Sequence, residues 1–353
     1  MMLRSLFKVN VNPGYVRLTI SCLSALLLIG SCSTGEQTSE EEIERQLFRL
    51  GHSLNTDHPV HKGMVRMAEL VEEKSDGKME VRIYPNEQLG TERETLELLQ
   101  IGSLDFTKVS SAVMESFSPT FRVFGIPFMF EDIDHMHRVL DGDIGREILD
   151  AAEPYRIVGL AYYDAGMRSF YTNNRPILHP DDLQGMSIRV QESPMAMRTV
   201  QTLGGSPTPI SWGELYTALQ QGVVDGAENN PPSLETSRHY EVTDYYSLNE
   251  HTAVPDIFLM SLNTWQQLTE AEQEIIKEAS LESVEYQREL WAEAEESAFE
   301  TFEEAGVEIH HPDKEPFMEA VEPYYDWVET RFPDLYEIMQ EIRAKGDQLT
   351  EAE

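Results

Sequence analysis

Two histidines lie three residues apart in a short segment that could bind a metal ion. The segment reads Asp57, His58, Pro59, Val60 and His61, so a carboxylate and two imidazoles are close in the chain. Imidazole and carboxylate are common ligands of zinc. Proline resists a position inside a helix but is common in its first turn. The same residues therefore also fit the start of a helix, which the proline favours over a metal site.

Arginines at predicted strands indicate a site for an anion. Arg168 directly follows one strand candidate, and Arg189 lies in another. In open α/β sheets ligands bind beyond the carboxyl ends of the strands, where a guanidinium can pair with both oxygens of a carboxylate. Lys108, one of eight lysines, ends a third apolar strand. Each cation could instead form a surface ion pair, because the chain is rich in glutamate.

Motifs of several common enzyme classes are absent from the sequence. It contains no Gly-x-Ser-x-Gly motif, no P-loop and no paired cysteines at zinc-ligand spacing. A secreted metal-dependent hydrolase that uses His58, His61 and Glu92 stays open as an alternative of a different class. Loss of activity or stability on chelation would identify such an enzyme.

Length and charge narrow the possibilities further. The 353 residues exceed the usual size of one hydrophobic core, which predicts two domains. The 63 acidic residues stand against 27 lysines and arginines, a net charge of −36 that would repel nucleic acids and anionic membrane surfaces. This acidity fits either adaptation to high salt or simple solubility. An anionic ligand would need scarce cations gathered in one cleft.

The amino-terminal segment has the order of a secretory signal. Basic residues come first, an apolar stretch covers residues 20–29, and Gly30 and Ser31 precede Cys32. The apolar stretch is shorter than the roughly 20 residues of a membrane span. Small residues before a cysteine resemble a bacterial lipobox, so we expect residues 1–31 to be removed and Cys32 to be lipidated; an incidental thiol is the alternative. Residues 32–46 would form an acidic tether.

Strand and helix patterns alternate along the rest of the chain. This order is typical of a doubly wound α/β sheet. The predicted strands are 47–50, 79–84, 104–109, 157–163, 169–172 and 186–190, and the predicted helices are 60–74, 92–101, 194–203 and 212–221.

Residues 269–305 contain neither glycine nor proline and are rich in glutamate and alanine. As one helix they would extend over roughly 50 Å, enough to brace two domains. A kinked pair of helices is the alternative.

Several ordered motifs resemble those of one known family, the substrate-binding proteins of the TRAP (tripartite ATP-independent periplasmic) transporters. The resemblance runs from about Phe48 to Tyr325. Its main motifs are GGSPTPISWGELYTALQ at 204–220 and VDGAEN at 224–229. Further motifs are YP at 84–85 with QLG at 88–90, GSLD at 102–105, FGIPF at 124–128, GV at 306–307 and HP at 311–312.

The resemblance implies a two-lobed clamshell of the periplasmic-binding-protein type, with the ligand buried at the hinge. Each lobe would hold a mixed sheet flanked by helices, and a long helix would bridge the lobes. Lobe I would comprise residues 47–165 and about 255–290, and lobe II residues 166–254 and about 291–353. The membrane permease subunits of a TRAP transporter would be the partner, with a lipid anchor as the only membrane contact. No cofactor and no catalytic residue are implied.

The resemblance also assigns site residues. Arg189 matches the arginine that pairs with the ligand carboxylate, Arg168 a second ligand-facing arginine, Asn229 a ligand-bonding amide and Trp212 an aromatic wall residue. Trp212 could instead be a core residue, and Asn229 a helix cap. The facing lobe would contribute position matches whose residue types differ from the family pattern: Glu92, Lys108, Ser110, His52 and Ser53.

The residue types facing the arginines suggest which acid is bound. Relative to sialic-acid binders of the family, Lys108 and Ser110 replace an apolar residue and an acid, which adds hydrogen-bond donors. A sugar acid such as a hexuronate or aldonate would place its carboxylate on Arg189 and its hydroxyls on Glu92, Lys108, Ser110 and Asn229. A C4-dicarboxylate, with its second carboxylate on Lys108 or Arg168, is the alternative, and a sensor using the same cleft is a further one.

Overall fold

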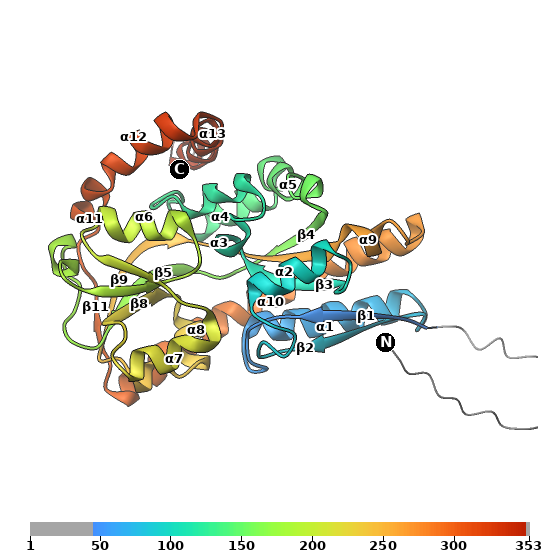
Figure 1. Cartoon of the computed structure of the whole chain (residues 1–353), viewed down its shortest axis with the longest axis horizontal. Coiled ribbons are helices and arrows are strands. Elements are labelled where there is room, and N and C mark those ends of the chain that lie inside the picture. Colours follow the sequence, from blue (N-terminus) through green and yellow to red (C-terminus); the bar gives the residue numbers. More distant parts are fainter. Residues whose placement is uncertain (1–44, 351–353) are drawn as a thin grey trace, which may run out of the picture. The chain divides into compact units, whose positions relative to one another are not determined.

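The computed structural model describes residues 45–350 and contains two sheets (Figure 1). The predicted signal segment 1–31, Cys32 and all but the last two residues of the predicted tether lie outside the described residues. We call the first sheet, with helices α1–α5 and α9, the first lobe. The second sheet, with helices α6–α8, is the second lobe.

The first sheet has five strands in the order β2-β1-β3-β10-β4. They are β1 Gln46–Gly51, β2 Met79–Tyr84, β3 Phe106–Ser110, β4 Ile157–Tyr163 and β10 Asp256–Ser261. β1 runs parallel to β2 and β3, but β10 is antiparallel to both β3 and β4. The local strand–helix pattern alone favours parallel pairing, which is wrong for β10 because this strand returns from the second sheet. The sheet is mixed, as the family resemblance implied.

The second sheet has six strands in the order β11-β9-β5-β8-β6-β7 and is also mixed. β6 pairs in parallel with β7 and β8, whereas β5 is antiparallel to β8 and β9. Its strands are β5 Met167–Thr172, β6 Ser187–Val190, β7 Ser206–Pro209, β8 Gly226–Asn229, β9 Tyr245–Ala253 and β11 Glu308–His310.

Helices flank both sheets, and their starts follow from local sequence. The His58 ring accepts a hydrogen bond from the Val60 backbone N–H (3.2 Å), with Pro59 in the first turn, so the histidine segment begins a helix. The helices of the first lobe are α1 Pro59–Lys74, α2 Glu92–Gln100, α3 Ser111–Met114, α4 Ile133–Leu140, α5 Asp143–Asp150 and α9 Leu262–Trp265. Those of the second lobe are α6 Pro194–Thr202, α7 Trp212–Gln220 and α8 Pro231–Thr236.

One continuous helix, α10 (Glu270–Ala305), packs on both lobes, which confirms the long-helix prediction over a kinked pair. A capping box at Thr269 begins it, and Gly306, at φ 85°, ends it. Its first half packs on α1, and its second half contacts α8 and β11. Between these halves, Gln287 exchanges hydrogen bonds of 2.8 and 3.0 Å with the backbone N–H and C=O of Asp164, where the chain crosses from β4 to β5. The helix therefore fixes a crossing point between the lobes.

The carboxyl-terminal helices close over the junction of the lobes. They are α11 Glu315–Ala320, α12 Glu322–Arg331 and α13 Pro333–Thr350. α12 packs on α6, while α13 packs on α4 and on the 3₁₀ helix η1 (Pro119–Gly125). The residue boundaries of the two lobes stay a prediction.

Glu115 is fully buried at this junction and is expected to make stability depend on pH. Its carboxylate accepts hydrogen bonds from the Ser193 hydroxyl (2.8 Å) and the Met195 backbone N–H (3.3 Å), but burial raises its pKa from 4.5 to about 8. The folded state therefore binds a proton that the unfolded chain releases. This contribution to stability is fully present below about pH 4.5 and is lost as the pH rises through about 8.

Replacing this carboxyl by an amide tests the effect. Glu115→Gln cannot ionise, so its free energy of unfolding relative to the wild type should increase between about pH 5 and about pH 9. Urea unfolding of both proteins across this range measures the difference. A difference that stays constant with pH would contradict the assignment.

Candidate functional site

A cavity lies between the two lobes, with a volume of about 610 Å³ that includes space open to solvent. Residues of both lobes line it, including the ends of β3 and β6 and the first residues of α2, α7 and β10. Eight of the nine predicted ligand-binding residues are on its wall: Ser53, Glu92, Lys108, Ser110, Arg168, Arg189, Trp212 and Asn229. We call it the ligand cavity.

Arg189 lies on this wall with much of its hydrogen-bonding capacity unused. Its Nε donates to the Ile210 carbonyl (2.9 Å), and its guanidinium carbon lies 5.9 Å from the Trp212 ring centroid. The residue is 2 % exposed, and its Nη1 is buried without a hydrogen-bond partner among the described residues. Burial lowers the pKa of Arg189 below its usual range. A buried N–H group without a hydrogen-bond partner destabilises the protein, so an acceptor that bound here would remove this free-energy cost.

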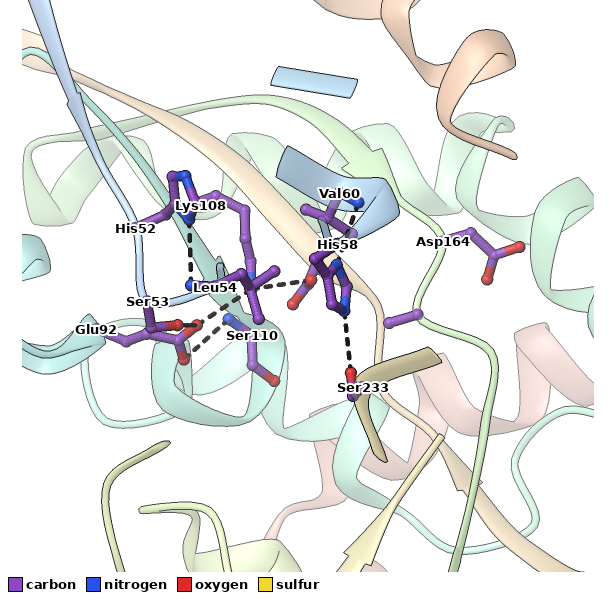
Figure 2. A network of polar contacts seen from close by, with 12 residues as sticks. His52, Ser53, Leu54, His58, Val60, Glu92, Lys108, Ser110, Asp164 and Ser233 are labelled. Atoms are coloured by element: carbon purple, nitrogen blue, oxygen red, sulfur yellow. Dashed lines mark hydrogen bonds and ion pairs between the residues drawn. The ribbon is translucent and has the colours of Figure 1, made fainter. Parts of the chain in front are cut away.

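Lys108 lies on the opposite wall between two carboxylates, Glu92 at 3.2 Å and Asp256 at 2.9 Å. Burial opposes its charge, but the two carboxylates outweigh burial and raise the pKa of Lys108. Figure 2 shows that Glu92 also accepts hydrogen bonds from the Ser53 hydroxyl (3.2 Å) and the Ser110 backbone N–H (3.3 Å). The cluster of Lys108, Glu92 and Asp256 is therefore held rigidly and has one more negative than positive charge.

Arg168 is paired within the protein. Its Nη2 donates to the Glu228 carboxylate (2.9 Å) and to the Glu228 carbonyl (2.8 Å), and its Nη1 donates to the Asn229 side-chain oxygen (2.6 Å). Burial opposes the guanidinium charge, but Glu228 outweighs burial and raises the pKa of Arg168. The Asn229 oxygen also accepts from the Asn230 backbone N–H (3.0 Å), so its orientation is fixed. Among the described residues, the amide nitrogen of Asn229 donates no hydrogen bond.

The charges on the cavity wall are uneven as a result. Among residues 45–346, Arg189 is the one lining cation without a carboxylate within 4 Å. The Arg168 charge is cancelled by Glu228, and the Lys108 cluster is negative overall. Glu87 and Glu192 add two more carboxylates to the wall. The cavity therefore offers one unpaired positive charge that faces several hydrogen-bond acceptors.

The two lobes also touch directly around the cavity. The Asn55 amide donates to the Thr236 carbonyl (2.7 Å), and the Gly213 backbone N–H donates to Glu87 (3.2 Å). A side chain at Gly213 would displace this carboxylate, because a Cβ would lie 2.4 Å from its oxygen. The structure therefore has the two lobes in contact over the cavity.

Comparison with known proteins identifies the family to which this architecture belongs. The family model described as bacterial extracellular solute-binding protein, family 7, matches residues 50–331. The chain belongs to this family. An uncharacterised protein of Salmonella typhimurium, YiiZ, is 39 % identical over 335 residues, which are 94 % of this chain and 98 % of that protein.

Solved structures of TRAP periplasmic solute-binding proteins share the family 7 fold. One from Anaerococcus prevotii, with bound D-glucuronate, is 36 % identical and has a TM-score of 0.84, covering 86 % of this chain and 99 % of that one. Another from Sulfitobacter, with bound β-D-galacturonate, is also 36 % identical, with a TM-score of 0.83 and coverage of 85 % and 100 %. The predicted family and the predicted two-lobed mixed α/β architecture with its long helix are confirmed.

His52 differs from the other predicted site residues, because it does not line the ligand cavity. Its Nε2 lies 3.0 Å from the Nδ1 of His61, and its Nδ1 accepts from the Leu54 backbone N–H (3.1 Å). Burial, followed by the neighbouring His61, lowers the pKa of His52 well below its usual range. His52 supports the backbone behind Ser53.

The histidines proposed for a metal site have other partners. His58 Nε2 lies 3.1 Å from the Ser233 hydroxyl of the second lobe, as Figure 2 shows, while His61 contacts His52 and Glu92 contacts Lys108. Across the described residues, no group of three or more histidine, cysteine, aspartate or glutamate side chains is arranged to hold a metal ion. The structure does not bring His58, His61 and Glu92 together around one ion.

Two partners of the wall cations in this family 7 protein were not predicted from the sequence: Asp256, which lines the ligand cavity, and Glu228, which pairs with Arg168 without lining it. Asp256 begins β10, and Glu228 directly precedes Asn229 in the VDGAEN motif. The motif was the only available signal for Glu228, and nothing in the sequence marked Asp256 as a partner of Lys108. Within the described part of the chain, no helix combines the length and apolar character needed to cross a bilayer.

Proposed function

We propose that this family 7 protein captures a hexuronate, or a closely related monocarboxylic sugar acid, outside the cytoplasm and delivers it to the membrane subunits of a TRAP transporter. Similar proteins of the family carry glucuronate or galacturonate in their solved structures, which supports this choice. The protein acts by binding and release and catalyses no reaction.

The observation that carries the proposal is the unpaired Arg189 facing an acceptor-rich wall. A monocarboxylic sugar places its one carboxylate on this guanidinium as a bidentate pair. Its hydroxyl groups then donate to the carboxylates of Glu92 and Asp256, whose positions are fixed by Lys108. The Asn229 amide and the Ser110 hydroxyl complete the polar contacts, and Trp212 covers the sugar ring.

The same charges disfavour the C4-dicarboxylate alternative. A second carboxylate would have to approach Lys108 or Arg168, each of which is already neutralised by at least one protein carboxylate. It would also face Glu92 and Asp256 at short range, where like charges repel strongly in a poorly hydrated cavity. Hydroxyl groups meet no such repulsion.

A thermal-shift screen tests the ligand class directly. At about 100 times its dissociation constant, a ligand adds about 2.7 kcal/mol to the free energy of unfolding. We expect glucuronate or galacturonate to raise the melting temperature, while succinate and malate leave it unchanged. Stabilisation by the dicarboxylates and not by any sugar acid would reject the proposed ligand and favour the alternative.

We also propose that Cys32 carries a lipid that anchors the mature protein at the membrane. The small residues before Cys32 and the polar segment after it support this. Cys32→Ala should move the protein from the membrane fraction to the soluble fraction of bacterial cells expressing the full chain. A variant that stays in the membrane fraction would refute the anchor.

A further inference from the structure

A second cavity lies away from the ligand cavity, in a groove bordered by η1, α6 and α12. It has a volume of about 770 Å³, including space open to solvent, and shares no lining residue with the ligand cavity. Apolar side chains form most of its surface, including Met197, Trp327 and Phe332. We call it the junction groove, because η1 packs on α3 of the first lobe and α6 belongs to the second lobe.

Each of the three bordering elements contributes one arginine to the junction groove: Arg122 from η1, Arg198 from α6 and Arg331 from α12. All three guanidiniums lie over aromatic rings. Arg122 is 5.2 Å and Arg331 5.7 Å from the Phe332 centroid, and Arg198 is 5.4 Å from the Trp327 centroid. Such stacking orients the planar cations and leaves their N–H edges available.

These three arginines have no ion-pair partner among the residues that the structure describes. Among residues 45–346, no carboxylate lies within 4 Å of any of them, although the chain has 63 acidic residues and 27 lysines and arginines. The Nε atoms of Arg122 and Arg198 are buried with no hydrogen-bond partner in the same part of the chain. Buried donors without partners are costly and rare in folded proteins.

We propose that the junction groove is a second binding site, for a small organic anion with an apolar body. The anionic group, a carboxylate, sulfonate or phosphate, would accept hydrogen bonds from the guanidiniums. The apolar body would cover the rings of Trp327 and Phe332 and the flexible side chain of Met197. This site is independent of the proposed sugar-acid function, because it uses other residues.

An anion in the groove would also tie three elements together at the junction of the lobes. The same three elements already meet at Tyr324 of α12, whose hydroxyl lies 3.4 Å from the carbonyls of both Gly125 in η1 and Met195 in α6. A ligand that contacts arginines of the same three elements would stabilise this arrangement. Binding should therefore raise the melting temperature as well as the probe signal.

The fluorescent sulfonate 8-anilinonaphthalene-1-sulfonate is a suitable probe, because it joins an aromatic body to one anionic group. We would titrate it into the purified protein with saturating glucuronate and, separately, into Arg189→Ala, which removes the free cation of the ligand cavity. Wild type and Arg189→Ala should bind the sulfonate alike. The uncharged analogue N-phenyl-1-naphthylamine should bind about tenfold more weakly, since it lacks the charge-assisted bonds.

Charge-removing variants decide the assignment. Arg122→Gln, Arg198→Gln and the more exposed Arg331→Gln should each weaken sulfonate binding, by up to about tenfold, while glucuronate affinity stays unchanged. Arg238→Gln, an exposed arginine paired with Glu241, is the matched control and should have no effect. The proposal would be overturned if the wild type did not bind the sulfonate, or if all three groove variants bound it as tightly as the wild type does. It would also be overturned if the uncharged analogue bound the wild type as tightly as the sulfonate does, or if Arg189→Ala lost sulfonate binding.

Discussion

Replacing Arg189 by alanine is expected to weaken hexuronate binding roughly thirty- to several-thousand-fold. In the ligand cavity the bound carboxylate loses its water, and Arg189 is its one partner with a free charge. Removing one member of such a buried charge pair costs about 2 to 5 kcal/mol, at about 1.4 kcal/mol for each tenfold change in affinity. Isothermal titration calorimetry with glucuronate and galacturonate measures the change.

The unliganded Arg189→Ala protein should fold normally, which separates a binding defect from a folding defect. The side chain is buried and its Nη1 has no partner among the described residues, so its removal leaves no other charge uncompensated. Arg189→Lys should recover only part of the affinity, because an ammonium cannot form the bidentate pair. Affinity within about threefold of the wild type in a folded Arg189→Ala protein would mean that the carboxylate binds elsewhere.

Arg168→Ala is expected to act mainly on stability, with a loss of about 3 to 5 kcal/mol in the free energy of unfolding. The substitution leaves the buried carboxylate of Glu228 without its principal partner and the Asn229 oxygen without one of its donors. Hexuronate affinity should also fall, because Asn229 loses its fixed orientation. Urea unfolding of the unliganded protein measures the first effect.

A double variant provides the control for Arg168. Arg168→Met combined with Glu228→Gln removes both charges, so most of the lost stability should return, as it does when a buried ion pair is replaced as a unit. The free energy of unfolding lost by the double variant could instead equal the sum of the losses in its two single variants, or Arg168→Ala could be as stable as the wild type. Either result would show that the pair with Glu228 has no structural importance.

The local sequence predicted the elements whose residue patterns are regular. The uninterrupted stretch before Gly306 predicted α10, and alternating apolar residues predicted β2 at its observed bounds. The resumed strand–helix order predicted β4 at its observed bounds. Strand β9 escaped because it carries buried polar residues such as Asn249 and His251, which obscure the alternation. The direction of β10 is set by the return of the chain from the other lobe, which no local pattern encodes.

In the candidate site, too, the residues were predictable from the sequence, but their long-range partners were not. Positions at predicted strands pointed to Arg168 and Arg189, and the family motifs pointed to Trp212 and Asn229. The structure has all four on the cavity wall. The partners of the cations could not be predicted, because Lys108 meets Asp256 only through the antiparallel pairing of β10 with β3. These partners matter, since they leave Arg189 as the cation with a free charge.

Calorimetry with a hexuronate and its neutral hexose tests the central claim most directly. Glucuronate and glucose, or galacturonate and galactose, differ only at the carboxylate that we assign to Arg189. The uronate of at least one pair should bind roughly thirtyfold or more tightly than its hexose, since the hexose leaves the buried guanidinium unpaired. A hexose that binds as tightly as its uronate would contradict the account.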